Sequence, residues 1–384
     1  MNIVIVGPAF PYRGGIAHAS TLLASHLRKR HTVHMVTFTR QYPGFLFPGT
    51  SQEEAASQSH DASYDTLPVR WIDSINPLNW ITAGRRIAAM KPDLLIFRYW
   101  LPFFGPCFGT VARVVRRAGR TKVLYLCDNI IPHERRPGDK PFTRYAFGAG
   151  DSFLVQSDTV EQQLLDLLPG ANYEKIPHPV YELFGAVTPR TEARTKLQLS
   201  TRNVVLFFGY IRKYKGLMTL IEAFARYLND VKDSPTLADT TLMVVGEFYD
   251  DEARYRNRAA ELGLGDRIRF VAEYVPTDAV SGYFSASNVV VLPYLSATQS
   301  GIVQIAYNFG TPVITTDVGG LGEVVRDGVT GFVVPPDNPQ QVAAALQRFF
   351  SGNHEEGFSA NIEIERKKYS WEAMAEAVER LASV

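Results

Sequence analysis

Two cations at the end of a buried strand are the residues of this sequence best placed to do chemistry. The apolar run VVLFF leads into GYIRKYKG, which puts Arg212 and Lys215 in a loop that starts at Gly209 and precedes a helix. A guanidinium offers a planar fork to phosphate oxygens, and an ammonium offers a compact charge. A solvated basic turn is the alternative, but the position directly after a buried strand favours a phosphate site.

A second candidate phosphate site lies in residues 296–314, which read SATQSGIVQIAYNFGTPVI. Small polar residues and a glycine begin an apolar helical stretch there, and the N–H groups and dipole of a helix start favour phosphate. An ordinary N-cap in front of a core helix uses the same geometry, so both interpretations stay open. The candidate donor-binding residues of this segment are Thr298, Gln299, Ser300, Gly301, Ile302, Val303 and Gln304.

Two more glycine-bearing loops follow apolar strands in the second half of the chain. In DVGGLGEVV, Gly319 and Gly320 suit a close approach of the backbone, while Glu323 can accept hydrogen bonds from a hydroxylated ligand or cap its own helix. In LMVVGE, Gly246 and Glu247 end a strand in the same way. We therefore add these residues to the candidate donor site.

The first half of the chain offers a glycine pair and a polar loop. Gly14 and Gly15 follow the first strand without a G-x-G-x-x-G or P-loop pattern, which disfavours nicotinamide dinucleotide and P-loop chemistry. In YLCDNIIPHERR, Asp128 and Asn129 stand where a strand meets its loop, and His133 follows. These three side chains can contact substrate hydroxyls or act as acid or base, although a single loop histidine is more often a surface residue.

Composition narrows the possible partners. The chain has 384 residues, which suggests two domains, and 40 basic against 39 acidic residues give a net charge of +1, which does not favour nucleic acid. Only two cysteines are present, which fits a reducing, cytoplasmic compartment. The first residues, MNIVIVGPAFPYRGG, do not resemble a signal peptide, and no apolar stretch approaches the ~20 residues needed to span a bilayer.

We expect no metal and no cofactor. The eight histidines are scattered, and no H-x-x-x-H or D-x-D pair stands at a strand end. Because a diphosphate leaving group needs charge neutralisation, Arg212, Lys215 and the helix start at Ser300 must supply it.

These residues need an α/β scaffold, and the order of apolar runs predicts one. Short apolar runs of this kind are typical of strands in parallel sheets, and ligands bind at the carboxyl ends of such strands. The predicted strands are residues 3–6, 33–38, 69–72, 94–97, 123–126 and 153–156, followed by VVLFF, TLMVV, IRF, VVVLPY, TPVITT and GFVVP. Helical spacing appears over residues 16–30, 217–228 and 340–350, whereas 41–65 read as a long polar loop.

With these motifs the sequence resembles a GT-B glycosyltransferase, and specifically one of the family 4 or "group 1" type. The strand-G-x-x-x-x-x-K-G element matches Gly209, Lys215 and Gly216. The longer G-x-P-V-I-x-T-x-x-G-G-x-x-E-x-V-x-x-G-x-x-G run matches Gly310, Pro312, Val313, Ile314, Thr316, Gly319, Gly320, Glu323, Val325, Gly328 and Gly331.

The resemblance implies two Rossmann-like parallel-sheet domains that face a central cleft. Residues 1–180 would be the acceptor side, 200–365 the nucleotide-sugar side, and 366–384 a terminal helix that packs back on the first domain, with the linker over 178–200. It also implies metal-independent transfer with retention, from a nucleotide-diphosphate sugar to a glycan or lipid-linked acceptor. Lys215 would bind the diphosphate, Gly14 and Gly15 would lie beside donor and acceptor, and Tyr274 and Val275 would lie against the base.

The sequence departs from the family pattern at three places. The two glutamates that the family carries ahead of the G-x-P-V motif are Ala297 and Ile305 here, and Thr298, Gln299 or Gln304 are the candidates to replace them. The arginine after the strand glycine is Tyr210, whose role Arg212 can take. The histidine at the end of the fifth strand is absent, and Cys127, Asp128 and Asn129 occupy that corner.

These departures keep two alternatives open: a catalytically inactive GT-B-like binding protein, and a GT-B nucleotide-sugar epimerase. Peripheral contact with the inner face of a membrane is a further expectation. Phe103, Phe104 and Phe108 precede four arginines, which suits an anionic membrane surface, although a core helix with a basic outer face explains the same pattern. The sequence does not indicate the oligomeric state.

Overall fold

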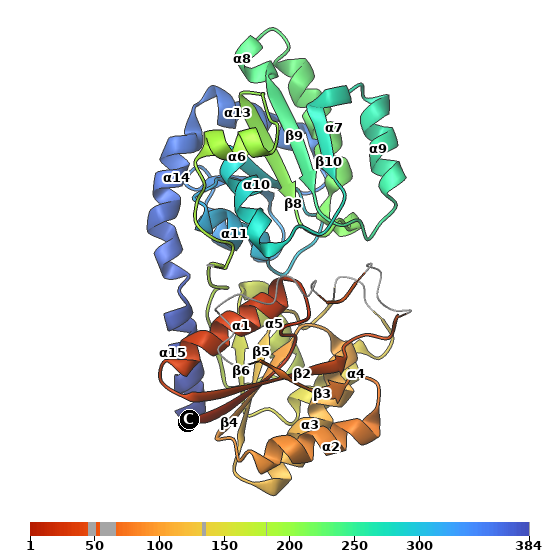
Figure 1. Cartoon of the computed structure of the whole chain (residues 1–384), viewed down its shortest axis with the longest axis vertical. Coiled ribbons are helices and arrows are strands. Elements are labelled where there is room, and N and C mark those ends of the chain that lie inside the picture. The colour runs from red at the N-terminus through yellow and green to blue at the C-terminus, as the bar shows by residue number, and fades with distance from the viewer. Residues whose placement is uncertain (45–50, 54–66, 133–135, 182, 384) are drawn as a thin grey trace. The chain divides into compact units, whose positions relative to one another are not determined.

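The computed structural model describes residues 1–44, 51–53, 67–132, 136–181 and 183–383, which form two compact units (Figure 1). Unit 1 contains Met1–Pro179 and Ser370–Val384, and unit 2 contains Val180–Tyr369. The candidate residue His133 and most of the predicted loop over residues 41–65 lie outside the described residues.

Unit 1 is built on a seven-stranded parallel sheet with the order β3-β2-β1-β4-β5-β6-β7. The strands are β1 (Asn2–Val6), β2 (Thr32–Arg40), β3 (Val69–Asp73), β4 (Leu94–Tyr99), β5 (Lys122–Cys127), β6 (Ser152–Val155) and β7 (Tyr173–Lys175). The first six confirm the predicted strands. The seventh is short and polar, and its sequence YEK gave no apolar run from which to predict it.

Helices cover both faces of this sheet. One face carries α2 (Pro77–Ala89), α3 (Gly105–Ala118), α4 (Asp139–Phe147) and α5 (Asp158–Leu167), whose apolar residues share one core with alternate strand residues such as Val4, Leu95 and Tyr125. The other face carries α1 (Gly15–Arg28) and α15 (Trp371–Ser383), which pack on each other. The last helix of the chain therefore belongs to unit 1.

The core of unit 1 contains aromatic residues that the sequence suggested for a membrane surface. Phe104 and Phe108 are fully buried, and the Phe108 ring centroid lies 5.0 Å from that of Phe97. Phe103 is partly buried against the same core. The expectation that these phenylalanines face a membrane is therefore wrong, because the apolar side of α3 packs on the sheet.

Unit 2 is built on a six-stranded parallel sheet with the order β10-β9-β8-β11-β12-β13. Its strands are β8 (Asn203–Phe208), β9 (Thr240–Val245), β10 (Ile268–Val271), β11 (Val289–Leu292), β12 (Val313–Thr316) and β13 (Gly331–Val334), and all six confirm the prediction. Its helices are α6 (Arg190–Lys196), α7 (Leu217–Asp230), α8 (Pro235–Ala238), α9 (Glu252–Glu261), α10 (Val280–Ala286), α11 (Gly301–Asn308), α12 (Leu321–Val324), α13 (Pro339–Ser351) and α14 (His354–Glu365). Helix α6 lies within the segment predicted as a linker.

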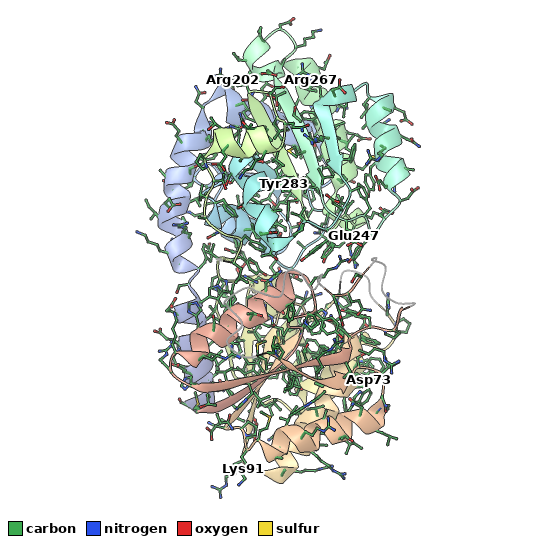
Figure 2. All side chains as sticks on the ribbon, viewed as in Figure 1. Asp73, Lys91, Arg202, Glu247, Arg267 and Tyr283 are labelled. Atoms are coloured by element: carbon green, nitrogen blue, oxygen red, sulfur yellow. The ribbon has the colours of Figure 1, made fainter. Side chains whose placement is uncertain are left out.

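The parallel strands bring their carboxyl ends to one edge of the sheet. Figure 2 labels Arg202 and Arg267, which precede β8 and β10, at one end of unit 2, and Glu247, which follows β9, at the other. The loops after β8, β9, β11 and β12 therefore meet at the end marked by Glu247, where every candidate loop of unit 2 is found.

These loops pack so closely that glycine is required in them. A Cβ at Gly216 would overlap the carbonyl oxygen of Pro293, and a Cβ at Gly319 would overlap that of Ala297. Both glycines have positive φ, 69° and 52°. The glycines of the GYIRKYKG and DVGG loops thus serve loop-to-loop packing at the carboxyl edge.

We predict that Gly216→Ala destabilises unit 2 by about 2 kcal/mol more than Gly263→Ala. The two glycines have nearly the same φ, 69° and 67°, but a Cβ at Gly263 would meet nothing within 4 Å. Both variants pay the left-handed backbone cost, so urea unfolding of the pair isolates the clash with Pro293. Equal losses of free energy of unfolding would contradict the described packing.

Candidate functional site

Lys215 is the buried cation of unit 2. It ends a short 3-10 helix over Lys213–Lys215 and is only 9% exposed. A Cβ at Gly209 would lie 3.2 Å from its Nζ and 3.2 Å from Cδ1 of Ile302, so the ammonium lies close to both the end of β8 and the first turn of α11. Its Nζ is 5.6 Å from the centroid of the Tyr294 ring. The structure therefore brings the two predicted phosphate segments together at Lys215.

The electrostatic environment of Lys215 is unfavourable for its charge. Burial, and to a lesser extent the nearby Arg212 guanidinium, lower the pKa of Lys215 to about 7. In the part of the chain that the structure describes, no carboxylate forms an ion pair with Lys215. A buried amine with no acidic partner is most stable when an anion is bound beside it.

Arg212 is held by a stack of tyrosines. Its guanidinium carbon lies 5.0 Å from the centroid of the Tyr249 ring, and Tyr249 stacks on Tyr210 at 4.8 Å. Tyr210 in turn lies 6.3 Å from Tyr274 with the rings inclined by 24°. The three tyrosines follow β8, β9 and β10, so they line one edge of the sheet. Sequence reasoning missed Tyr249, although its place shortly after GE at a strand end was a usable signal.

The start of α11 is capped by its own residues. Ser300 Oγ accepts from the N–H of Ile302 at 3.3 Å, and the N–H of Val303 donates to Ser300 O at 3.2 Å. The Tyr294 hydroxyl lies 3.4 Å from Ser300 Oγ, and a Cβ at Gly301 would contact the Tyr181 ring. The helix start is thus an ordered cap beside Lys215, which leaves both interpretations of this segment open.

The two positions where the family pattern expects glutamate are apolar and buried. Ala297 is 8% exposed and Ile305 is 5% exposed. Their neighbour Gln304 is 1% exposed, and its Oε1 has no hydrogen-bond partner among the described residues. A buried amide oxygen without a partner costs about 1–3 kcal/mol, so Gln304 is the strongest candidate to accept a hydrogen bond from a ligand.

The remaining candidates of unit 2 follow β9, β10, β11 and β12. Glu247 is 7% exposed, and its carbonyl accepts from the N–H of Ile211. Val275 and Thr298 are buried, and the Thr298 carbonyl accepts from the N–H of Gly320 at 2.9 Å. Glu323 is exposed on α12.

In unit 1, Asp128 has a partner that sequence reasoning missed. Arg98, at the end of β4, donates from Nε and Nη2 to both carboxylate oxygens of Asp128 at 2.6 and 2.5 Å, and Arg98 is 1% exposed. Burial raises the pKa of the Asp128 carboxyl, and Arg98 offsets part of that effect. Since both oxygens are engaged, the predicted acid or base role of Asp128 requires that this pair open. The signal was an arginine inside the otherwise apolar run LLIFRYW.

Other polar groups lie near this ion pair. Burial and the Arg98 charge lower the pKa of His178 to about 3, so its ring is neutral at physiological pH. Asn129 Oδ1 is buried with no partner among the described residues. Gly14, with φ 105°, is the N-cap of α1 and forms no side-chain cap hydrogen bond, and Gly15 is the first residue of that helix. Unit 1 thus contains a buried polar cluster in which the Arg98 charge acts on both Asp128 and His178.

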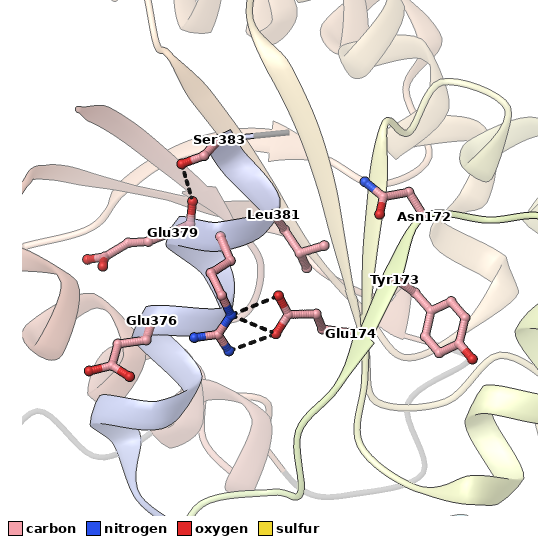
Figure 3. Close-up of a pocket in the computed structure, with 8 residues that line it drawn as sticks. Asn172, Tyr173, Glu174, Glu376, Glu379, Leu381 and Ser383 are labelled. Atoms are coloured by element: carbon pink, nitrogen blue, oxygen red, sulfur yellow. Dashed lines mark hydrogen bonds and ion pairs between the residues drawn. The ribbon is translucent and has the colours of Figure 1, made fainter.

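A hollow of about 700 Å³ in unit 1 contains none of the predicted site residues (Figure 3). It lies between β7 and α15, and its central feature is the ion pair in which Arg380 donates to both carboxylate oxygens of Glu174 at 2.8–3.2 Å. Because its main charges neutralise each other, this hollow is not the candidate site. Within the described ranges, no three His, Cys, Asp or Glu side chains gather as a metal site, and metal independence stays a prediction.

Comparison with known proteins identifies relatives of this chain. The family model "Glycosyl transferases group 1" matches residues 202–351. A D-inositol 3-phosphate glycosyltransferase of Geodermatophilus obscurus is 32% identical over 195 residues, which cover 49% of this chain and 42% of that protein. The chain spans about half the length of the first curated relatives that it matches.

Solved structures resemble the whole chain. The structure of Anabaena Alr3699/HepE in complex with UDP and glucose covers 100% of both chains with a TM-score of 0.76 and 17% identity. Sucrose-phosphate synthase from Thermosynechococcus elongatus covers 99% of this chain and 98% of that chain, with a TM-score of 0.73 and 21% identity. At these identities the likeness shows the fold, which is α/β with two parallel sheets.

We predict that binding of a nucleoside diphosphate at Lys215 takes up a proton above about pH 7. With its pKa at about 7, the unliganded amine is increasingly neutral as the pH rises, and a bound anion restores the charge. Affinity should then fall toward about tenfold per pH unit well above pH 7, and uptake by Lys215 should fade to nearly zero about one pH unit below its pKa. Titration calorimetry in buffers of different ionisation enthalpy measures the uptake, and Lys215→Met is the control in which it should vanish. Binding without any uptake at about pH 8 would contradict the assignment.

Proposed function

We propose that this chain is a GT-B glycosyltransferase of the group 1 type and that it moves a sugar from a nucleotide-diphosphate donor to a glycan or lipid-linked acceptor. The observation that carries the proposal is the buried ammonium of Lys215, placed beside Gly209 and the first turn of α11 without a carboxylate partner among the described residues. A departing diphosphate supplies the negative charge that this position lacks.

In the proposed reaction, this chain neutralises the leaving group with its own cations. Lys215 contacts the diphosphate, and Arg212, held against Tyr249, adds a second positive charge nearby. A preorganised cation stabilises charge that develops as the glycosidic bond to phosphate breaks. We therefore propose transfer without a divalent metal ion. Full turnover in the presence of a chelator supports this, and loss of turnover that added magnesium restores would contradict it.

We further propose that transfer proceeds with retention, on the strength of the family pattern from Gly209 to Gly331. NMR of the first-formed product measures the anomeric configuration and thereby tests this directly. Two similar proteins, a D-inositol 3-phosphate glycosyltransferase and a protein solved in complex with UDP and glucose, suggest the first probes: uridine diphosphate, UDP-glucose and inositol phosphate. A thermal-shift screen with these and other nucleoside diphosphates identifies the donor, because a ligand at many times its Kd stabilises measurably.

The same edge of unit 2 also favours a second candidate, an inactive nucleotide-binding protein. The buried apolar Ala297 and Ile305 stand where the family pattern has glutamates, so donor binding without transfer is consistent with the site. An epimerase acting on the nucleotide sugar alone remains the third. Slow release of nucleoside diphosphate from the donor separates an active transferase from the inactive protein, and NMR of the recovered sugar reveals epimerisation.

We predict that Lys215→Ala lowers kcat by about 10²–10³ while the protein remains folded, because the leaving group loses a placed cation. Lys213→Ala is the matched control, since Lys213 is an exposed lysine in the same 3-10 turn and should leave the rate unchanged. Nucleoside diphosphate release, followed alongside circular dichroism, makes the measurement. Wild-type turnover in Lys215→Ala would reject the site.

We also predict that Gln304 contacts a hydroxyl of the donor in place of the missing glutamates. Gln304→Leu should lower kcat/KM for the nucleotide sugar about tenfold or more and leave the affinity for the bare nucleoside diphosphate unchanged. Gln340→Leu, an exposed position on α13, controls for the loss of an amide. An equal loss of affinity for both ligands in Gln304→Leu would show a structural role instead.

A further inference from the structure

Backbone hydrogen bonds fix the loop after β9 to the loop after β8. The N–H of Ile211 donates to the carbonyl of Glu247, and the N–H of Tyr249 donates to the carbonyl of Ile211, both at 2.9 Å. Ile211 and Phe248 form a parallel bridge that continues the pairing of the two strands. The backbone of Tyr249 is therefore hydrogen-bonded to the residue that directly precedes Arg212.

The rest of the β9 loop is anchored to the core of unit 2 and to helix α9. The ring centroid of Phe248 lies 5.8 Å from that of Tyr255, which is buried. The Tyr255 hydroxyl donates to Asp250 Oδ2 at 2.7 Å, and Asp251 is the N-cap of α9. Tyr249 thus lies between two anchored residues, Phe248 and Asp250, so its backbone has little freedom to move.

The partly buried side chain of Arg212 lies against the Tyr249 ring. Its guanidinium carbon is 5.0 Å from the ring centroid, a distance at which a cation is attracted to the electron-rich face of an aromatic ring. The Tyr210 ring stacks on Tyr249 at 4.8 Å, with the two rings inclined by 30°. Among the residues that the structure describes, no carboxylate forms an ion pair with Arg212. An aromatic ring, rather than a carboxylate, therefore orients this guanidinium.

Arg212 needs such a contact because a second cation lies nearby. Arg212 and Lys215 carry charges of the same sign, and the Arg212 charge contributes to lowering the pKa of Lys215. Like charges repel more strongly where burial excludes water, so an unrestrained arginine would turn away from Lys215 into solvent. The side chain of Lys213, which directly follows Arg212, is exposed in this way.

We infer that Tyr249 is a positioning residue, which holds Arg212 near Lys215 so that both cations act on one bound diphosphate. The inference rests on the proposed function, because two cations need this placement only if a diphosphate binds between them. A carboxylate in the place of the ring would hold the guanidinium as well, but it would also neutralise it. An aromatic ring attracts a cation and carries no net charge, so the positive charge of Arg212 stays available to the anion.

The first test needs no ligand and measures the pKa of Lys215 in the full chain, by NMR titration of isotope-labelled lysine side chains. Arg212→Gln should raise this pKa, because a repelling charge is lost, and Tyr249→Leu should raise it in the same direction, because Arg212 is no longer held. Tyr249→Phe keeps the ring and should titrate like the wild type. Tyr294, whose ring centroid is 5.6 Å from the Lys215 amine, stays neutral in this range because burial raises its own pKa.

The second test measures the affinity of the full chain for inorganic pyrophosphate by titration calorimetry. Pyrophosphate presents the two phosphates without a base or a sugar, so the result does not depend on which nucleotide the protein uses. Tyr249→Leu should weaken binding about two- to fivefold, and Arg212→Gln should weaken it at least as much. Tyr249→Phe should bind like the wild type, and Lys215→Met should lose most of the affinity.

Tyr145→Leu is the matched control for both tests, since Tyr145 of unit 1 contacts Arg113 at 4.1 Å in the same manner and should change neither result. An unchanged Lys215 pKa in Tyr249→Leu, beside a raised pKa in Arg212→Gln, would overturn this inference alone. A further rise when Tyr249→Leu is added to Arg212→Gln would overturn it too, because the ring would then act by shielding the amine from water. Equal pyrophosphate binding by the wild type and Lys215→Met would instead contradict the proposed function, whatever the Lys215 titration shows.

Discussion

Unit 2 holds the ammonium of Lys215 out of water with no carboxylate paired to it in the described structure, and this costly placement explains the carboxyl edge of its sheet. Burial of a charge without a partner opposes folding unless an anion compensates it. The glycines at 216 and 319 let neighbouring loops pack tightly at this edge, and the first turn of α11 lies close to the amine. A diphosphate bound beside the amine during function would compensate its charge and thereby explain these features.

In unit 1, by contrast, the buried cation Arg98 has a carboxylate partner. Arg98 is the most buried charged residue in the described part of the chain, but both oxygens of Asp128 accept hydrogen bonds from it. Removing either partner would leave a buried charge without a counter-ion. The pair therefore stabilises the carboxyl ends of β4 and β5. Arg98 is thus a buried charge with a partner inside the fold, whereas Lys215 is a buried charge whose expected partner is a ligand.

The sequence predicted the architecture well because short apolar runs report buried parallel strands directly. It missed β7, whose residues Tyr173–Lys175 are polar and lie at the edge of the sheet, and it read α6 as part of a linker. Local pattern was enough to place Gly209, Arg212 and Lys215 in one loop after a buried strand, as the structure has them, and their role at a donor site stays a prediction. The Arg98–Asp128 pair, the tyrosine stack and the burial of Phe104 and Phe108 depend on contacts between separate strands and helices, which no local pattern contains.

A crystal structure of the chain with a bound nucleoside diphosphate at neutral pH tests the central claim most directly. We expect a phosphate oxygen within hydrogen-bond distance of Lys215 Nζ, with Arg212 close to the same diphosphate. A diphosphate bound elsewhere on the chain, with the Lys215 amine still enclosed and out of contact with any anion, would contradict it.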